Sequence, residues 1–428
     1  MPDRSLIAPS TRDSSPPSPL WGEGPGVRGG PCCSTHDRTQ RRLLHPSPQP
    51  SPQRGEGVRS SLRRAVSSLL IVIVITGTTS AQTGSKKPKS TPQTGGTRAQ
   101  LDALIEREGK TPPDWFKSTS LNHPQSLDLN WPERPEGGWN NQKNVGQFLW
   151  DVINPNPGRW REGVKLMHHL LTLHKDDPVK RERNMLTLGS MYHNLIEDYA
   201  RAAFWYRAVG VEKDPEEYAR SAVILAECYW RLGFTDEAKE FLEKVPKSTS
   251  HAKLLGDMGE TDRAVEMALS ELPDPQGYVQ LTAGDACRQA GRYDEAIKFY
   301  QQIMDIEVPA KNPPGRLLQN RKRADANITA IKAFELFDLK MVSDGKYISA
   351  SQGYEGPVEV TVTVQRGRID SVAITKHREK QFYSAMTDTP AKIIAKQHVK
   401  GVDTTSNATI TSEAIVNATA KALAGGKN

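Results

Sequence analysis

The chain reads D-T-T-S-N-A-T-I-T-S from Asp403 to Ser412 and continues into a helix-forming run, Glu413 to Leu423. A series of hydroxyl side chains and one carboxylate therefore stand immediately ahead of a helix. The first turn of a helix carries unpaired backbone N–H groups and the positive end of the macrodipole, so it can bind a phosphate group. The stretch indicates a phosphate site, and the alternative is an ordinary Ser/Thr-rich loop that caps a helix.

This stretch resembles the D-x-x-S-G-A-T-x-T-S signature of the FMN-binding domain family, found in the C subunit of sodium-pumping quinone reductases and the G subunit of Rnf complexes. In that family a flavin transferase joins FMN through its phosphate to the threonine that corresponds to Thr409. Asn407 replaces the usual glycine, and asparagine tolerates the left-handed backbone that glycine adopts. The resemblance implies a cofactor-binding loop made of Asp403, Ser406, Asn407, Ala408, Thr409, Thr411 and Ser412. The last two are expected to cap the helix start.

The sequence ahead of this loop predicts a β-hairpin. Valines alternate with polar residues from Val358 to Val364, which is the pattern of a half-buried strand. Residues 366–368 (R-G-R) form the turn, and Ile369 to Thr375 form a second strand. A short helix is expected over Lys392–His398. This order of strand, strand, helix, loop and helix is similar to that of the FMN-binding domain throughout.

The resemblance therefore predicts a small α+β FMN-binding domain at residues 340–426. Its D-G-x-Y opening stands at Asp344, and its G-x-x-G-P run ends in Gly356 and a proline. We interpret Tyr354, Gly356 and Phe382 as part of the flavin site, with the two aromatic rings contacting the flavin. The alternative for these rings, and for Tyr383, is a place in the hydrophobic core.

The preceding region, residues 146–335, carries a repeated helical pattern. Ala202, Ala238, Ala264 and Ala296 begin similar runs that lie 36, 26 and 32 residues apart. The two clearest copies, Leu225–Val245 and Ala283–Ile303, resemble tetratricopeptide repeats, with turn glycines at Gly233 and Gly291. Stacked repeats form an all-α array whose concave face usually binds a protein. The fold class is thus a multidomain chain, with a tetratricopeptide-like helical array followed by the α+β domain. A spacer role for the array is the alternative.

The first part of the chain predicts export. Residues 58–81 combine arginines, the apolar run L-L-I-V-I-V-I from Leu69 to Ile75, and a small-residue cleavage site before Gln82. This run is too short to span a membrane in the mature chain. Residues 1–57 hold a Pro/Gly/Ser repeat that cannot form a core, and we interpret them as a disordered extension from a start site placed too far upstream. Residues 82–145 are expected to be a linker and an irregular, tryptophan-rich segment.

Charge and cysteine content exclude several other classes. Residues 1–81 hold ten Lys and Arg residues against five Asp and Glu residues, so they carry +5 of the formal +7 charge and leave +2 for the rest. The mature chain therefore lacks the basic character of a nucleic-acid partner. Cys228 and Cys287 hold equivalent positions in two repeats and are predicted to be buried free thiols. No metal-ligand spacing or catalytic motif is present, so no catalytic or metal residues are expected.

Together these features predict a secreted flavoprotein, periplasmic or otherwise extracytoplasmic in a bacterium after cleavage near Ala81. It would carry FMN covalently on Thr409 through a phosphoester and relay electrons, more as an electron-transfer flavoprotein than as an enzyme with its own substrate. The expected partners are a flavin transferase, for maturation, and a redox protein or membrane reductase that docks on the helical repeats. The alternative is a non-redox interaction scaffold whose FMN-binding domain is degenerate, and Asn407 favours it.

Overall fold

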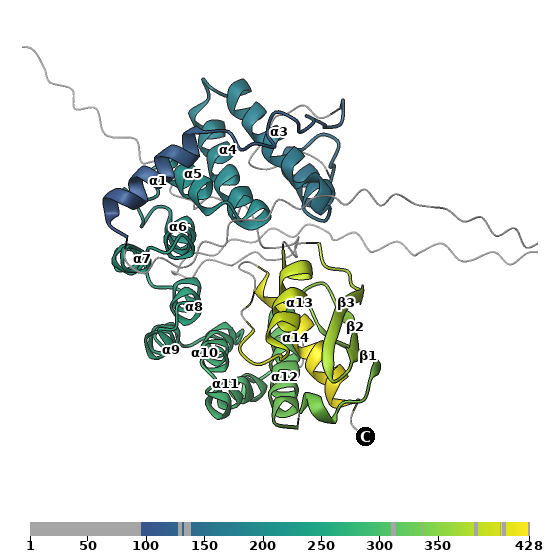
Figure 1. The fold of residues 1–428 in the computed structure, drawn as a ribbon. Coiled ribbons are helices and arrows are strands. Elements are labelled where there is room, and N and C mark those ends of the chain that lie inside the picture. Colours follow the sequence, from purple (N-terminus) through teal and green to yellow (C-terminus); the bar gives the residue numbers. More distant parts are fainter. Residues whose placement is uncertain are drawn as a thin grey trace, which may run out of the picture. The chain divides into compact units, whose positions relative to one another are not determined.

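The computed structural model describes residues 96–126, 131, 138–309, 314–336, 338–380, 384–402, 404 and 408–426. The predicted upstream extension and signal peptide lie outside these residues, as does the start of the predicted linker. Along the described chain a set of helices is followed by a three-stranded sheet with further helices (Figure 1). Within the described ranges, none of the helices has the length and apolarity that a bilayer span requires.

The first part is all-α, as predicted. Its α-helices are α1 (Arg98–Lys110), α2 (Val145–Phe148), α3 (Trp160–Leu173), α4 (Pro178–Met191), α5 (Tyr199–Val209), α6 (Ala219–Arg231), α7 (Thr235–Leu242), α8 (Thr249–Asp257), α9 (Thr261–Leu269), α10 (Tyr278–Gln289), α11 (Tyr293–Asp305) and α12 (Gly315–Leu336). Short π or 3-10 turns are η1 (Leu149–Ile153), η2 (Pro157–Arg159) and η3 (Tyr192–Ile196). Consecutive helices pack on one another from α3 to α7 and from α8 to α12, α6 contacts α8, and α1 packs against α5.

The two predicted repeats form the helix pairs α6/α7 and α10/α11, and their turns are alike. Gly233 and Gly291 have φ of 93° and 76°, a left-handed conformation that glycine adopts without strain. In each turn the glycine N–H and the next N–H donate to carbonyls of the preceding helix, at 2.9 and 3.0 Å after Gly233 and at 3.1 and 2.8 Å after Gly291. Cys228 and Cys287 are buried and unpaired, which confirms that prediction.

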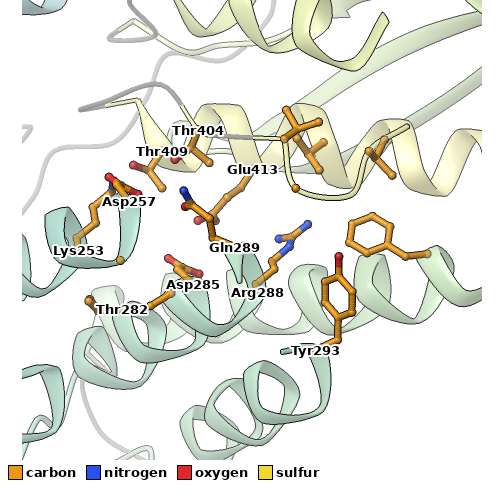
Figure 2. Close-up of a pocket in the computed structure, with 17 residues that line it drawn as sticks. Lys253, Asp257, Thr282, Asp285, Arg288, Gln289, Tyr293, Thr404, Thr409 and Glu413 are labelled. Carbon is orange, nitrogen blue, oxygen red and sulfur yellow. The ribbon is translucent and has the colours of Figure 1, made fainter. Parts of the chain in front are cut away.

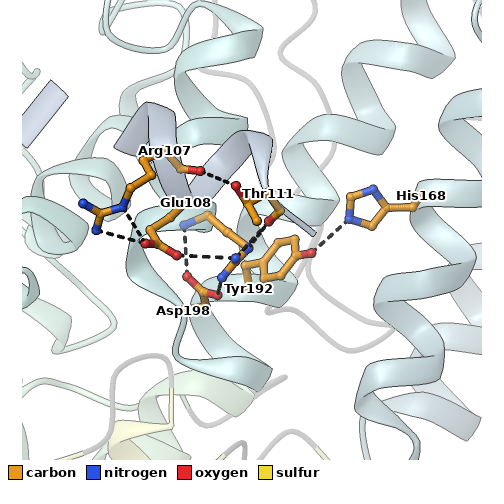
Figure 3. A network of polar contacts seen from close by, with 7 residues as sticks. Arg107, Glu108, Thr111, His168, Tyr192 and Asp198 are labelled. Carbon is orange, nitrogen blue, oxygen red and sulfur yellow. Dashed lines mark hydrogen bonds and ion pairs between the residues drawn. The ribbon is translucent and has the colours of Figure 1, made fainter. Parts of the chain in front are cut away.

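A polar network joins α1 to the helices behind it (Figure 3). The Arg201 guanidinium on α5 donates to the Thr111 carbonyl at 3.0 and 2.9 Å and lies 3.5 Å from Glu108. Behind this network, the His168 ring of α3 and the Tyr192 hydroxyl of η3 form a hydrogen bond of 3.0 Å. Burial lowers the pKa of His168 to about 4, so its ring is neutral at physiological pH. Helix α1 is therefore held against the array by these contacts.

The second part contains the antiparallel sheet β1 (Gly345–Gln352), β2 (Pro357–Gln365) and β3 (Arg368–Lys376), in that order across the sheet. The predicted hairpin is β2–β3, and the four alternating valines of β2 are fully buried. Asp344 explains the D-G-x-Y opening, because its carboxylate accepts the N–H groups of Arg366 and Gly367 at 2.8 and 3.2 Å and so holds the hairpin turn. These bonds lower the pKa of Asp344.

Three elements of the second part differ from their predictions. Strand β1 was not predicted, because its residues G-K-Y-I-S-A-S-Q show no apolar alternation; it forms by pairing along β2, from Gly345 opposite Val364 onward. Helix α13 (Ala385–Lys396) begins before the predicted Lys392 and continues through Pro390. Helix α14 (Thr409–Ala424) begins at Thr409, four residues before the predicted start. A 3-10 turn, η4 (Leu339–Met341), precedes the sheet.

The hydrophobic core is continuous between the two parts. Helix α14 packs on β1 and β2 and also against α12. One cluster of buried side chains includes Tyr300 and Ile303 of α11, Phe334 of α12, and Val360 and Ile415 of the α+β part. Apolar packing therefore crosses the stretch between residues 335 and 340, where the sequence predicts a boundary between domains.

Candidate functional site

Helix α14 begins within the Ser/Thr-rich stretch, with Ala408 at its N-cap and Thr409 as its first residue. Ala408 is buried and makes no side-chain cap bond. The Ser412 N–H donates to the Ala408 carbonyl at 2.9 Å, so the helical ladder starts there and the N–H groups before it lie at the helix end. This is the position at which a helix offers N–H groups to an anion.

The hydroxyl of Thr411 does not cap this helix, contrary to expectation. It donates to the Glu379 carboxylate at 2.5 Å, and both groups are buried. The same carboxylate accepts the N–H groups of Tyr354 and Glu355 at 3.2 and 2.8 Å. Glu379 therefore ties the G-Y-E-G turn ahead of β2 to the first turn of α14. Ser412 is fully buried on α14.

The glycines of that turn are needed for close packing. A Cβ at Gly353 would lie 2.8 Å from Glu379 Oε1 and from the Gly356 carbonyl oxygen, and a Cβ at Gly356 would lie 2.7 Å from Arg378 Nη2. Both contacts are shorter than van der Waals separation allows. The G-x-x-G part of the motif therefore lets Glu379 and Arg378 approach the backbone. In this structure Gly356 has a packing role at the site.

The side chain of Tyr354 does not lie beside Thr409 in the structure. The Tyr354 ring lies against Arg316 of α12, whose guanidinium donates to the phenol oxygen at 3.3 Å, and its carbonyl accepts from Gln319 at 2.9 Å. Its side chain thus faces the start of α12 and does not line the pocket beside Thr409. Asp403, Ser406, Asn407 and Phe382, which complete the predicted site, lie outside the described residues, as does Tyr383.

A pocket borders Thr409, and helices of both parts of the chain line it (Figure 2). Helix α14 contributes Thr409, Glu413 and Val416, α10 contributes Thr282, Asp285, Ala286, Arg288 and Gln289, α8 contributes Lys253, Gly256 and Asp257, and the remaining wall comes from Tyr293, Phe334, Val399, Gly401, Val402 and Thr404. The pocket is partly open to solvent, and its volume is about 50 Å³. The pocket therefore accepts the edge of a planar ring, while the rest of such a ring would lie over the opening.

A buried ionic cluster forms the floor of this pocket. Arg323 of α12 donates to both oxygens of Glu413 at 3.1 and 3.0 Å and lies 3.6 Å from Asp285, which accepts the Tyr300 hydroxyl at 2.6 Å. Burial, together with the nearby charge of Glu413, raises the pKa of Asp285 to about 7. Two carboxylates thus share one guanidinium, and Asp285 holds a proton for part of the time at neutral pH.

These residues fit FMN. The first turn of α14 and the Lys253 ammonium, which pairs with Asp257, provide partners for a phosphate. The Thr409 hydroxyl is half-buried and lines the pocket, which is where a phosphoester would have to form. Aromatic and valine side chains supply apolar surface for a ring, and Arg288 and Gln289 supply hydrogen-bond donors. Within the described residues, no group of His, Cys, Asp and Glu side chains could hold a metal ion.

The sequence analysis missed Glu379, Glu413 and the pocket residues of the array. Glu413 carries a usable signal, because it is the only acid in the helix T-I-T-S-E-A-I-V-N-A-T-A-K-A-L-A and stands four residues after Thr409. A lone carboxylate on an apolar helix predicts a buried cationic partner. Nothing local identifies Arg323 as that partner, since it lies 90 residues away in the chain.

Comparison with known proteins agrees with this architecture. Residues 353–424 match the family described as FMN-binding domain, and residues 219–245 and 283–315 each match a family described as tetratricopeptide repeat. The chain is also 37% identical over 84 residues to an uncharacterized protein of Treponema pallidum (strain Nichols), a match that covers 19% of this chain and 23% of that protein. No solved structure is significantly similar. The chain therefore carries an FMN-binding domain preceded by tetratricopeptide repeats, as the sequence predicted.

Proposed function

We propose that the protein is an extracytoplasmic electron-transfer flavoprotein that carries FMN in phosphoester linkage on Thr409. The observation that supports this most directly is the position of Thr409, which is the first residue of α14 and lines a pocket. The walls of this pocket carry apolar side chains, two cations, and carboxylates that each pair with a cation. The helix start attracts the phosphate, and the neighbouring hydroxyl is the group to which a transferase would join it. Covalent attachment suits export, because FMN lost outside the cytoplasm is not readily replaced.

The protein's own residues would hold the cofactor and control its surroundings. FMN, when bound, supplies the electron chemistry, since its ring accepts electrons singly or in pairs. Glu379 fixes the first turn of α14 through Thr411, and so fixes the direction of the N–H groups that face a phosphate. The valines and aromatic rings of the pocket exclude water from the ring edge. We further propose that the helical repeats bind the protein that donates or accepts the electrons.

Expression of the mature chain together with a flavin transferase tests this function. We expect denatured protein to show in-gel flavin fluorescence and a mass increase of one FMN less one water. Thr409→Ala should abolish both signals, while Thr409→Ser should retain part of them, because serine keeps the hydroxyl. Thr404→Ala is the matched control, since Thr404 lines the same pocket and its removal leaves the attachment residue in place.

The same experiment decides against the scaffold alternative, which Asn407 favours. A chain that stays colourless and unmodified in the presence of the transferase would refute the electron-transfer function and leave the scaffold. A modified peptide that carries FMN on Thr411 or Thr405 would keep the function and refute Thr409 as the attachment residue.

A further inference from the structure

The pocket beside Thr409 has two walls from different parts of the chain. On one side, Thr409, Glu413 and Val416 follow the helical spacing of four and three residues and share one face of α14. On the other side, the residues come from the array helices α8 and α10. In Figure 2, Gln289 extends from α10 toward the Thr409 end of α14, and Tyr293 stands at the other end of the pocket. The wall opposite Thr409 therefore belongs to the helical array.

This array wall is fixed to the α+β part by buried polar contacts. Arg288 of α10 donates to Asn327 of α12 at 3.0 Å and to Asn417 of α14 at 2.7 Å, and Asn417 donates to Asn327 at 2.7 Å. Both asparagines are about 1% exposed. Together with the pair of Arg323 and Glu413, these bonds hold α10, α12 and α14 in one arrangement. The wall is consequently a built part of the site rather than a surface left free for a partner.

The chemistry of the array wall suits a planar, electron-poor ring. The rings of Tyr293 and Phe334 lie 5.9 Å apart at 61°, and the Arg288 guanidinium lies 5.4 Å from the Phe334 ring centre. Aromatic faces and edges attract such a ring, and a neighbouring cation favours the addition of electrons to it. Gln289, which is half-buried at the pocket, offers an amide that can both donate and accept.

We propose that the helical array forms the second wall of the flavin site, with Tyr293 and Gln289 contacting the ring of the FMN that Thr409 carries. This inference rests on the proposed function and extends it, because it assigns the repeats a direct part in the cofactor's environment. The array then sets the fluorescence and reduction potential of the flavin, and does more than dock a partner.

The test uses the full mature chain loaded with FMN by a flavin transferase. Covalent FMN is measured after denaturation, and flavin fluorescence and midpoint potential are measured in the native state. Tyr293→Leu should leave the covalent load unchanged and raise native fluorescence several-fold, because it removes a quenching ring; Tyr293→Trp should restore the quenching. Gln289→Glu should lower the midpoint potential, because an added negative charge opposes the addition of electrons.

Matched controls come from the array itself. Tyr278→Leu, at the opposite end of α10, and Gln301→Glu, on the exposed side of α11, should change neither fluorescence nor potential. If Tyr293→Leu loses its far-UV circular dichroism, Gln289→Glu decides the question, since its side chain is partly exposed and its substitution keeps the shape. Full covalent load with unchanged fluorescence and potential in both pocket variants would refute the inference and leave the proposed function intact.

A transferase that attaches no FMN would refute the proposed function, and the inference is then decided with free FMN. We would titrate FMN into the unmodified chain and the Tyr293→Leu variant and follow flavin fluorescence. Saturable quenching that the variant weakens at least several-fold would support a ring site on the array wall without covalent attachment. Quenching that is absent, or equal in the two proteins, would refute it.

Discussion

Replacement of Arg323 by methionine should destabilise the whole described structure at neutral pH. The side chain is 7% exposed, donates to both oxygens of Glu413 at 3.1 and 3.0 Å, and lies 3.6 Å from Asp285. Methionine keeps most of the volume but removes the cation that Glu413 and Asp285 share. Loss of one partner of a buried ion pair costs about 3–5 kcal/mol. For an m-value of about 3 kcal/mol/M, the urea midpoint should fall by about 1–1.7 M.

Tryptophan fluorescence shows whether the loss of stability reaches the part of the chain that does not contain Glu413. Every tryptophan of the chain lies before residue 231, so the signal reports the first array helices and the segment ahead of them, whereas Glu413 belongs to the α+β part. We expect the fluorescence midpoint of Arg323→Met to shift together with the far-UV circular dichroism. One apolar cluster joins the α+β part to α11 and α12, and the neighbouring cluster, which holds Trp131, includes Ala286 of α10. The loss should shrink as pH falls, since protonation of Asp285, whose pKa is raised, removes its repulsion with Glu413.

Two further variants serve as controls. Arg263→Met removes an exposed pair with Glu243 on the array surface and should cost no more than about 1 kcal/mol. The double variant Arg323→Met, Glu413→Leu replaces the buried pair by apolar groups and should recover most of the stability. A tryptophan transition that stays at its original midpoint in Arg323→Met, while the α+β part unfolds early, would refute the energetic connection between the two parts.

Other expectations follow from the same region. Because the folded-state pKa of Asp285, about 7, lies above its ordinary value of 3.8, its contribution to stability is present at acid pH and is lost as pH rises toward 7. Asp285→Asn should flatten this dependence in melting curves from pH 4 to 8, and an unchanged slope would contradict the assignment. Gly284→Ala should destabilise the protein by roughly 1–3 kcal/mol in urea unfolding, because its Cβ would lie 2.6 Å from the Tyr300 ring; Gly158→Ala, which meets open space, should have little effect.

The elements that could be predicted from the sequence are those whose signal is local. Alternating valines define β2 because one face of the strand is buried, and Gly233 and Gly291 mark repeat turns because those turns require positive φ. Strand β1 carries no such signal: its small and polar residues become a strand by pairing with β2. The start of α14 was placed late because Thr409 belongs to a residue type that also favours loops.

The candidate site, too, has a part that neighbouring residues indicate and a part that depends on residues far away in the chain. Thr409 could be proposed as the attachment residue from its own neighbours, because a phosphoester requires a hydroxyl and a helix start attracts a phosphate. Its surroundings could not, since Glu379 reaches Thr411 from 32 residues away and Arg288 reaches Asn417 from 129 residues away. Such contacts depend on the packing of whole helices, which no short motif encodes.

The position of the buried polar contacts argues for joint control of the flavin site by both parts of the chain. A helix that only needed to cover the sheet could be apolar on every buried face, because polar groups cost free energy when they are removed from water. Helix α14 instead buries Glu413 and Asn417 on the face turned to the array, and each has a partner there. These partners fix the register of α14 against α10 and α12. A shift of the array would therefore move the helix whose first residue is Thr409, so a protein that binds the repeats has a physical path to the site.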